Sequence, residues 1–335
     1  MAILILNQKE VEQLLPMESA MEAVAGAFRA LSAGQALNPL RQVMFLPGEL
    51  GVQVTMPAYL GDSAITGLKA ITVFPGNEGT AYESHQGAVL LFGTEHGELR
   101  AVVDASAITA IRTAAASGVA TRLLAREDAE NLALLGSGTQ AASHLEAMLL
   151  ARAIRRVRIW SRTPANARRF AERAAELHEV DIQPEPTVQE AVQDADVICT
   201  TTSAPAPILL GEWLRPGVHI NAVGSSVPFT RELDTSAVVR SRLFVDRRES
   251  TLNEAGDFLM PLKEGAVDEG HIQGEVGEIL LGQNPGRTSP EEITLFKSLG
   301  LAVQDLASAH YVYQAARDRG LGAEVDLGGQ RYVPD

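Results

Sequence analysis

The clearest chemical signature in the sequence is a pair of glycines, Gly136 and Gly138, in the stretch GSGTQA. They follow an apolar, strand-like segment and precede a helical pattern, with the small residue Ala141 in the third place. The first glycine allows a tight turn, the second lets the backbone approach a pyrophosphate, and the small third residue permits close packing of helix on strand. A plain glycine turn is the alternative. The flanking strand and helix patterns, with a second strand at the expected distance, favour a dinucleotide site.

The stretch after the second strand, VRIWSRTPANARR, indicates which nicotinamide cofactor the site prefers. NAD sites usually carry Asp or Glu at this point to bind the ribose hydroxyls, but here the first acid is Glu172. Ser161 and Thr163 can donate hydrogen bonds, and the guanidinium of Arg162 can pair with a 2′-phosphate. NADPH is therefore the expected cofactor, with NADH possible, unless Arg162 is only a solvated charge after a strand.

Short apolar segments separated by helical or turn patterns must position this site. Strands are expected at 131–135, 156–160, 195–202, 218–224 and 242–246. Strands that alternate with helices in this way predict a doubly wound parallel sheet. We therefore expect an α/β fold whose Rossmann-type NAD(P)-binding domain covers residues 116–305.

The remaining sequence has a different texture, which predicts a mixed α+β domain over residues 1–115 with 306–335. A helix is expected over 16–34, followed by short strands with turn signals. The alanine-rich stretch 106–125 is expected to form a helix that leads into the second domain. Apolar residues at helical spacing predict a last helix over 299–320, closed by Gly320 and packed on the first domain.

Composition excludes several classes of protein. A chain of 335 residues with 46% apolar and 21% charged residues predicts a globular protein of two domains. Its apolar runs are far shorter than the roughly 20 residues that span a bilayer, and its start lacks signal-peptide features, so a cytoplasmic location is expected. The net charge of −14 argues against nucleic acid or membrane as a partner. The single cysteine, Cys199, and the histidine spacing predict no metal site.

Several further stretches make the chain recognisable over nearly its whole length. They are HINAVGSSVPFTREL, FKSLGLAVQDLASAHYVYQ, SHQGAVLLF, AITAIRTAAASGVAT, ILLGEW and VRIWSRT. These resemble the ornithine cyclodeaminase and mu-crystallin family, with the greatest likeness to its ketimine-reductase branch. The resemblance implies a homodimer, an N-terminal substrate and dimerisation domain completed by the C-terminal helix, an NAD(P) domain, and a small α-amino or α-imino acid as substrate.

The resemblance places the family's substrate-carboxylate cations at Arg41, Lys69 and Arg112, in NPLRQV, GLKAIT and TAIRTAAAS. Each alone could be a solvated surface charge. However, Lys69 interrupts an apolar strand pattern and Arg112 lies among alanines, where a charge needs a partner. Converging cations would bind an anion even in an acidic protein, because long-range repulsion is screened beyond roughly 8 Å at physiological salt.

Two departures from the cyclodeaminase pattern bear on the reaction. Ser226 takes the place of a loop aspartate in AVGSSVP, and Val54 that of an acid in VQVTMP. Because a hydroxyl is a poor general base near pH 7, oxidation of an amine with loss of ammonia is not expected. We expect NAD(P)H-dependent reduction of a cyclic ketimine carboxylate, Δ1-pyrroline-2-carboxylate or Δ1-piperideine-2-carboxylate, to proline or pipecolate. Lys69, Arg112 and Ser226 are the expected catalytic residues, and Lys69 or Ser226 would hydrogen-bond the imine nitrogen or supply its proton through water.

Alternatives remain within and outside this chemistry. One is cyclodeaminase or alanine dehydrogenase activity, and another is an NADPH-dependent binding protein for iodothyronine-like ligands. The cofactor would contact residues in both predicted domains. Two of these residues have a structural alternative: His85 could simply be a polar residue at the start of a strand, and Ser298 could be a helix cap. The expected contacts are His85, Gln86, Arg112, Thr113, Gly136, Ser137, Gly138, Thr139, Gln140, Ser161, Arg162, Thr163, Asn166, Thr202, Ser203, Val223, Gly224 and Ser298.

Overall fold

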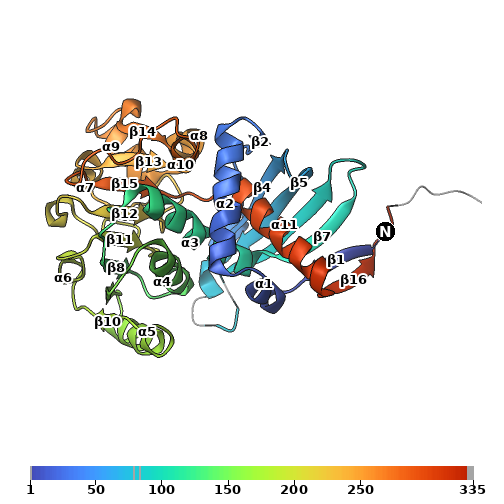
Figure 1. Ribbon diagram of the computed structural model, residues 1–335, viewed down its shortest axis with the longest axis horizontal. Helices are drawn as coiled ribbons and strands as arrows, with labels where there is room; N and C mark the ends of the chain where they lie inside the picture. Colours follow the sequence, from blue (N-terminus) through green and yellow to red (C-terminus); the bar gives the residue numbers. More distant parts are fainter. Residues whose placement is uncertain (1, 78–79, 83, 330–335) are drawn as a thin grey trace, which may run out of the picture. The chain divides into compact units, whose positions relative to one another are not determined.

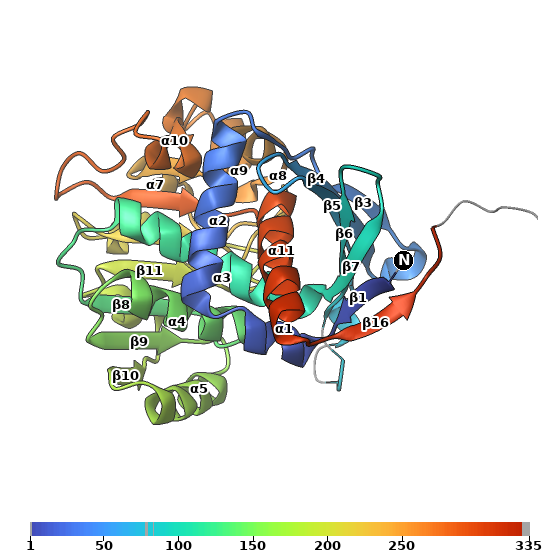
Figure 2. The same cartoon turned by 45° about the vertical axis from the view of Figure 1, so that its right-hand side comes forward.

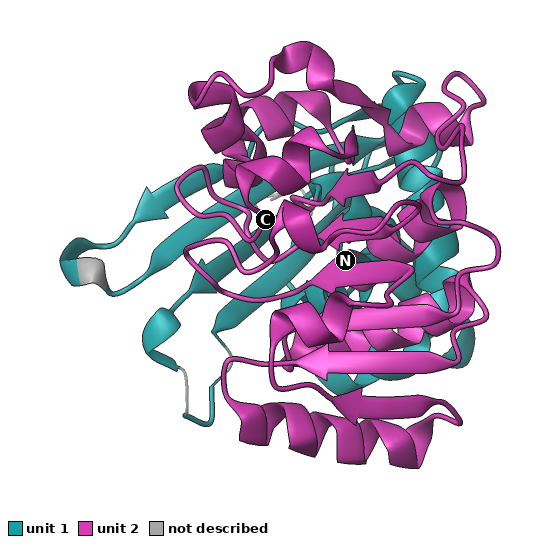
Figure 3. Ribbon diagram, turned by 90° about the vertical axis from the view of Figure 1, so that its left-hand side faces the viewer, with its two compact units in different colours: residues 1–112, 301–335 teal, residues 113–300 magenta. Residues whose placement is uncertain are grey.

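The structure, a computed structural model, describes residues 2–77, 80–82 and 84–329 and divides into two compact units (Figure 3). The first unit contains residues 1–112 and 301–335, and the second contains residues 113–300. The sequence placed these boundaries at 115 and 305. The first boundary falls inside helix α3 (Ala105–Leu124), which is continuous where a linker would be expected between two domains.

The first unit is a mixed, mostly antiparallel sheet with helices packed against it. Its elements are β1 (Ala2–Leu6), α1 (Gln8–Leu14), α2 (Met17–Ser32), β2 (Ala36–Leu37), β3 (Gln42–Phe45), β4 (Val52–Leu60), β5 (Ile65–Val73), β6 (His85–Gly93), β7 (Leu99–Asp104), the start of α3, α11 (Ala302–Arg319) and β16 (Ala323–Asp326). The strand order is β16-β1-β7-β6-β5-β4-β2, and β3 pairs with β4.

Helix α11 lies along the sheet strands β4 to β7, and α2 lies beside α11 (Figure 2). The segment from 302 to 319 therefore belongs to the first unit although it begins 198 residues (302 − 104) after the end of β7. The helix ends where expected, because Gly320 takes the left-handed conformation (φ 65°) that closes helices at little steric cost.

The second unit is a doubly wound parallel sheet (Figure 1). Its elements after α3 are β8 (Asn131–Leu135), α4 (Thr139–Ala151), β9 (Arg156–Trp160), α5 (Pro164–Leu177), β10 (Asp181–Pro184), α6 (Val188–Val192), β11 (Val197–Thr200), β12 (His219–Ala222), α7 (Thr235–Val239), β13 (Arg242–Val245), α8 (Arg248–Glu254), α9 (Gly256–Lys263), β14 (Ile272–Glu275), α10 (Val276–Leu280) and β15 (Thr294–Lys297). The strand order is β10-β9-β8-β11-β12-β15-β13-β14, and every pairing is parallel. The Rossmann-type sheet predicted from the sequence is thus present.

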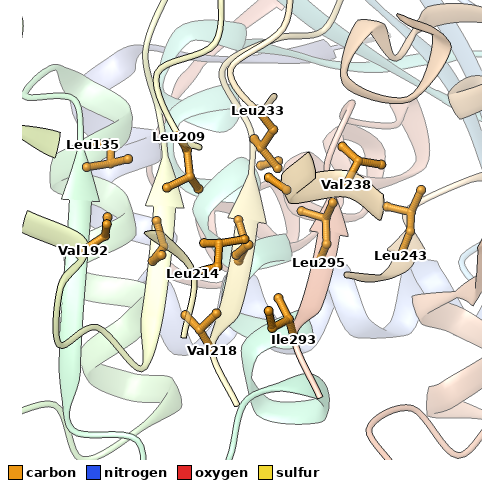
Figure 4. Close-up of a cluster of buried hydrophobic side chains, with 14 of the residues drawn as sticks. Leu135, Val192, Leu209, Leu214, Val218, Leu233, Val238, Leu243, Ile293 and Leu295 are labelled. Carbon is orange, nitrogen blue, oxygen red and sulfur yellow. The ribbon is translucent and has the colours of Figure 1, made fainter. Parts of the chain in front are cut away.

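The core of the second unit follows from strand alternation. Ala133 and Leu135 of β8 point to one face of the sheet, where they join side chains from α6, α7 and the neighbouring strands (Figure 4). Leu132 and Leu134, which alternate with them along the strand, are buried too, so β8 is covered on both faces. A strand buried on both faces needs a continuous apolar run, which is why NLALL is so clear a signal in the sequence.

Candidate active site

In the first unit, Lys69 and Arg112 share one buried carboxylate, that of Asp305. Lys69 Nζ lies 3.2 Å from Asp305 Oδ1, and Arg112 Nε lies 2.8 Å from the same oxygen. The three residues are only 1%, 5% and 0% exposed. Two cations face one carboxylate, so this group carries one positive charge in excess. Because a buried charge is costly without a partner, the excess suits a second anion.

Strand register explains why Lys69 is buried. Its pairing neighbours are Met56 on β4 and Val89 on β6, both buried apolar residues. Side chains that lie opposite each other across a sheet point to the same face, so the ammonium is on the apolar face of the sheet. Helix α11 packs on these strands and carries Asp305. The lysine that interrupts the apolar pattern of β5 is therefore matched by an acid from a distant helix.

The surroundings of Lys69 tune its acidity. Burial lowers the pKa of Lys69 from 10.5 to about 8; the charges of Arg112 and Arg41 also lower it, while Asp305 opposes the shift. Arg41, just before β3, therefore belongs to the same electrostatic neighbourhood. His85 belongs there too, because desolvation by its neighbours, and then the charges of Lys69 and Arg112, lower the pKa of its imidazole, while part of the residue remains exposed. A lysine that titrates near neutral pH can exchange a proton with a ligand.

Helix α11 presents more polar groups on the same face. Arg112 Nη1 donates to Gln304 Oε1 at 3.2 Å, and this oxygen also accepts the N–H of Leu301. Gln304 Nε2, Asp305 Oδ2 and Ser308 Oγ are buried and have no hydrogen-bond partner among the described residues. Buried polar atoms are usually paired, so these three offer hydrogen-bonding capacity for a polar ligand or water.

In the second unit, the glycine turn has the geometry that a pyrophosphate site needs. Gly136 has φ 127°, and a Cβ there would lie 2.6 Å from Thr201 Oγ1, so only glycine fits without strain. A Cβ at Gly138 would have no described atom within 4 Å. Helix α4 begins directly after it without a side-chain cap, and Gln140 Oε1 is buried without a partner within the described chain. These features fit a dinucleotide phosphate bound at a helix N-terminus.

The end of β9 lies beside this turn. Ser137 Oγ donates to Ser161 Oγ at 2.9 Å, which links the glycine turn to the residues after the second strand. Arg162 and Thr163 follow and are exposed. Asn166 is in the first turn of α5, where its Oδ1 accepts a hydrogen bond from Arg169. The sequence has no acidic residue at this strand end, so the polar groups that remain are hydroxyls and a cation.

Other predicted cofactor residues lie in loops at the carboxyl ends of the parallel strands. Thr202 and Ser203 follow β11, Val223, Gly224 and Ser226 follow β12, and Ser298 follows β15. Because the strands are parallel, these loops lie at one edge of the sheet, where ligands of doubly wound proteins bind. Ser226 is half-buried, and Ser298 Oγ is buried with no partner among the residues described.

The structure therefore groups the predicted residues by unit. Arg41, Lys69, His85 and Arg112 are grouped in the first unit, and exposed Gln86 follows His85 on β6. Thr113 is buried, next to Arg112 on α3. The glycine turn, the end of β9 and the later loops are in the second unit. No cluster of three His, Cys, Asp or Glu side chains suited to a metal occurs in the described ranges, and no described helix could cross a membrane.

Sequence reasoning missed two buried acids: Asp305, which contacts Lys69 and Arg112, and Glu232, which contacts the loops after β11 and β12. Asp305 follows Gln304 in LAVQDLASA, and an acid among mostly apolar and small residues in the first half of the helix was the available signal. Glu232, in TREL, is completely buried and accepts hydrogen bonds from Thr202 and Gly224. Nothing in the sequence around Glu232 separates it from an exposed acid in a loop.

The parallel sheet, the glycine turn and the uncapped helix define a dinucleotide-binding α/β protein. The sequence profile described as "Ornithine cyclodeaminase/mu-crystallin family" matches residues 1–320, and the chain belongs to that family.

Individual relatives are similar over nearly their whole length. The ketimine reductase mu-crystallin of Mus musculus is 41% identical in an alignment of 314 residues that covers 92% of this chain and 96% of that protein. The structure of Δ1-pyrroline-2-carboxylate reductase from Thermococcus litoralis in complex with NADH and L-proline has a TM-score of 0.94 and 38% identity, with 96% of this chain and 100% of that chain covered. An archaeal alanine dehydrogenase dimer with bound NAD has a TM-score of 0.92 and 34% identity, with 98% and 100% covered.

Proposed function

We propose that this protein is an NAD(P)H-dependent reductase of cyclic ketimine carboxylates, which converts Δ1-pyrroline-2-carboxylate or Δ1-piperideine-2-carboxylate into proline or pipecolate. The observation that carries the proposal is the buried group of Lys69 and Arg112 on the single carboxylate of Asp305. Its excess positive charge suits a small anion. The relatives named for reduction of such imines are similar to this chain along nearly their whole length.

The residues of the first unit would bind and orient the substrate. Arg112 would hold the substrate carboxylate through its guanidinium, with Arg41 adding positive charge. Lys69, with a pKa of about 8, carries a proton near neutral pH and can donate it to the imine nitrogen as the bond is reduced. Ser226 is the second candidate for a hydrogen bond to that nitrogen. A bound nicotinamide supplies the hydride.

The residues of the second unit would bind the cofactor. The amides at the start of α4 and the open space at Gly138 suit the pyrophosphate. At the end of β9, Ser161, Arg162 and Thr163 offer hydroxyl and guanidinium groups in place of the acid that NAD sites usually carry, which favours NADPH. NADH is expected to work less well.

We also infer a homodimer. Strand β3 is exposed along its whole length, and its side chains include Val43, Met44 and Phe45, which are 43%, 54% and 70% exposed. Contiguous exposed apolar side chains on a strand mark an interaction surface. The archaeal alanine dehydrogenase of the same fold is described as a dimer. Sedimentation of the purified protein tests the inference, and a monomer at micromolar concentration would contradict it.

The test of the proposed reaction combines a substrate panel with one variant. The panel contains cyclic ketimine carboxylates and pyruvate with ammonia, each incubated with NADPH or NADH, and ornithine, incubated with NAD. Each reaction is followed at the absorbance of the reduced nicotinamide. Turnover should be greatest with the cyclic imines, and ornithine with NAD should release no ammonia. Preferred use of pyruvate with ammonia would instead establish an alanine dehydrogenase.

Arg112→Met removes the charged fork and keeps much of the side chain's bulk. The loss of a buried charge-assisted contact, about 2 to 5 kcal/mol, should lower kcat/KM for Δ1-pyrroline-2-carboxylate by about 30-fold to several thousand-fold. Δ1-Pyrroline, which lacks the carboxylate, should lose little. Arg122→Met, at an exposed arginine on the same helix, is the matched control. Equal losses with both imines would show that Arg112 does not bind the carboxylate.

A further inference from the structure

Three charged residues are buried beneath the loops at the carboxyl edge of the second unit's sheet. They are Glu232, Asp257 and Lys297, and all three are almost completely hidden from solvent. The predicted substrate and cofactor residues do not include them. Burying three charges is costly, so the hydrogen bonds that each one makes indicate what the group does.

Glu232 joins two loops through four short hydrogen bonds. Its Oε1 accepts from the backbone N–H and the hydroxyl of Thr202, both at 2.7 Å. Its Oε2 accepts from the hydroxyl of Thr200 and the backbone N–H of Gly224, again at 2.7 Å. Thr200 and Thr202 belong to the end of β11 and the loop after it, whereas Gly224 is in the loop after β12. One carboxylate thus fixes the backbone of both loops.

The two loops are also in direct contact. A Cβ at Gly224 would lie 2.0 Å from the carbonyl oxygen of Thr202 and 2.5 Å from Glu232 Oε1. Only glycine allows so close an approach. The carboxylate therefore occupies a tightly defined position between Thr202 and Gly224, and a side chain of different charge or length cannot replace all four of its contacts.

Asp257 and Lys297 hold Glu232 in place. Asp257 Oδ1 accepts from the backbone N–H groups of Glu232 and Leu233 at 2.8 and 3.0 Å. Asp257 Oδ2 is 2.9 Å from Lys297 Nζ, which also donates to the carbonyl oxygens of Ala222 and Ser225. Lys297 therefore links Asp257 to Ala222 and Ser225, which lie on either side of Gly224 in the chain.

In a doubly wound sheet, the two halves of a dinucleotide bind on either side of the point where the strand order reverses. Here that point lies between β8 and β11. The glycine turn after β8 and the residues after β9 suit the pyrophosphate and the adenosine half. The loops after β11 and β12 are on the other side, which assigns them to the nicotinamide half.

We propose that Glu232 is a positioning residue that joins the loops after β11 and β12 and thereby shapes the binding site for the nicotinamide half of the cofactor. The inference rests on the proposed use of NAD(P)H, but not on the identity of the imine substrate. It concerns affinity for one half of a ligand, so it can be tested without any turnover.

The test compares two ligands on the Glu232→Gln variant. The amide nitrogen of glutamine cannot accept a hydrogen bond, so the substitution removes the bond from the backbone N–H of either Thr202 or Gly224, and the threonine hydroxyl at the same position must reverse its role. The size of the side chain is unchanged. Dissociation constants are measured by calorimetry for NADPH and for 2′,5′-ADP, which lacks the nicotinamide half. The affinity for NADPH should fall at least tenfold, whereas that for 2′,5′-ADP should change by less than about twofold.

Glu190→Gln is the matched control, because Glu190 also accepts from a threonine hydroxyl but is exposed. It should leave both affinities unchanged. If Glu232→Gln does not fold, Thr200→Val removes one of the same four bonds with little change of shape, and should show the same selective loss at smaller size. Equal losses for both ligands, or no loss for NADPH, would overturn the proposal. A wild-type protein that binds NADPH but reduces no imine would refute the proposed reaction alone.

Discussion

Replacing Asp305 with Asn should change the pH at which the enzyme loses activity. In the wild type, kcat/KM for a cyclic imine should fall as the pH rises through about 8, where Lys69 loses its proton. Asp305 favours the charged lysine through a contact of 3.2 Å. An opposite charge at this distance typically shifts a pKa by about 1 to 3 units, so its loss should move the alkaline limb down by about that much. At pH 7 the protonated fraction would then fall from about nine-tenths to half or less.

The assay is a pH profile of kcat/KM for Δ1-pyrroline-2-carboxylate from about pH 5 to 9.5. The substrate's own titration is the same for both enzymes, so the difference between the profiles reports the protein. Asp194→Asn removes an exposed ion pair with Arg215 and should leave the profile unchanged. Removing one partner of a buried pair costs about 3 to 5 kcal/mol, so thermal unfolding is measured alongside. A lower plateau with an unmoved alkaline limb would refute the assignment of that limb to Lys69 coupled to Asp305.

Four further substitutions test the cofactor site and the core of the second unit. Arg162→Asp should weaken NADPH binding by tenfold or more and affect NADH much less, because the new carboxylate repels the 2′-phosphate; equal losses would show that Arg162 does not contact that group. Gly136→Ala should destabilise the fold by about 1 to 3 kcal/mol in urea unfolding, since φ is 127° and the new Cβ meets Thr201, whereas Gly138→Ala should spare stability and impair nucleotide binding. Burial lowers the pKa of His144 from 6.5 to about 4, so the unfolded chain binds the extra proton between these values, and stability should fall by up to about 3 kcal/mol as the pH drops from 6.5 to 4. His144→Gln should reduce this acid loss, and an identical pH dependence in the two proteins would contradict the assignment.

The sequence predicted the second unit's sheet well where strands carry a clear apolar pattern. Strand β8 has the bounds expected because NLALL is a nearly continuous apolar run, and β9 has them because charged and apolar residues alternate along RVRIW. Strand β10 was missed because DIQP is mostly exposed at the edge of the sheet and carries no apolar pattern. Strand β15 was missed because a buried lysine ends it and a glycine-containing loop follows at once.

Site residues could be predicted from the sequence only where their own neighbours mark them. Lys69 stood out because it breaks the apolar alternation of a strand, and Gly136 because it lies between a strand and a helix. Asp305 lies 236 residues from Lys69 in the chain, and an acid in a helix is usually exposed. Which helix packs on which strand is decided by the tertiary fold, so the pairing of Lys69 with Asp305 was outside the reach of local patterns.

The two buried charged groups are better explained by function than by stability. Replacing buried ion pairs with apolar side chains of similar volume is often neutral or stabilising, so neither group is needed merely to fill the core. What apolar residues cannot supply is a cation held in one position, as with Arg112 on Asp305, or backbone N–H groups held by a carboxylate, as with Thr202 and Gly224 on Glu232. In the first unit, the group of Lys69, Arg112 and Asp305 contains more cations than acids, and this excess of positive charge suits an anionic substrate. The second unit's acids instead bind the protein's own loops, so their expected effect is on the shape of the cofactor site rather than on its charge.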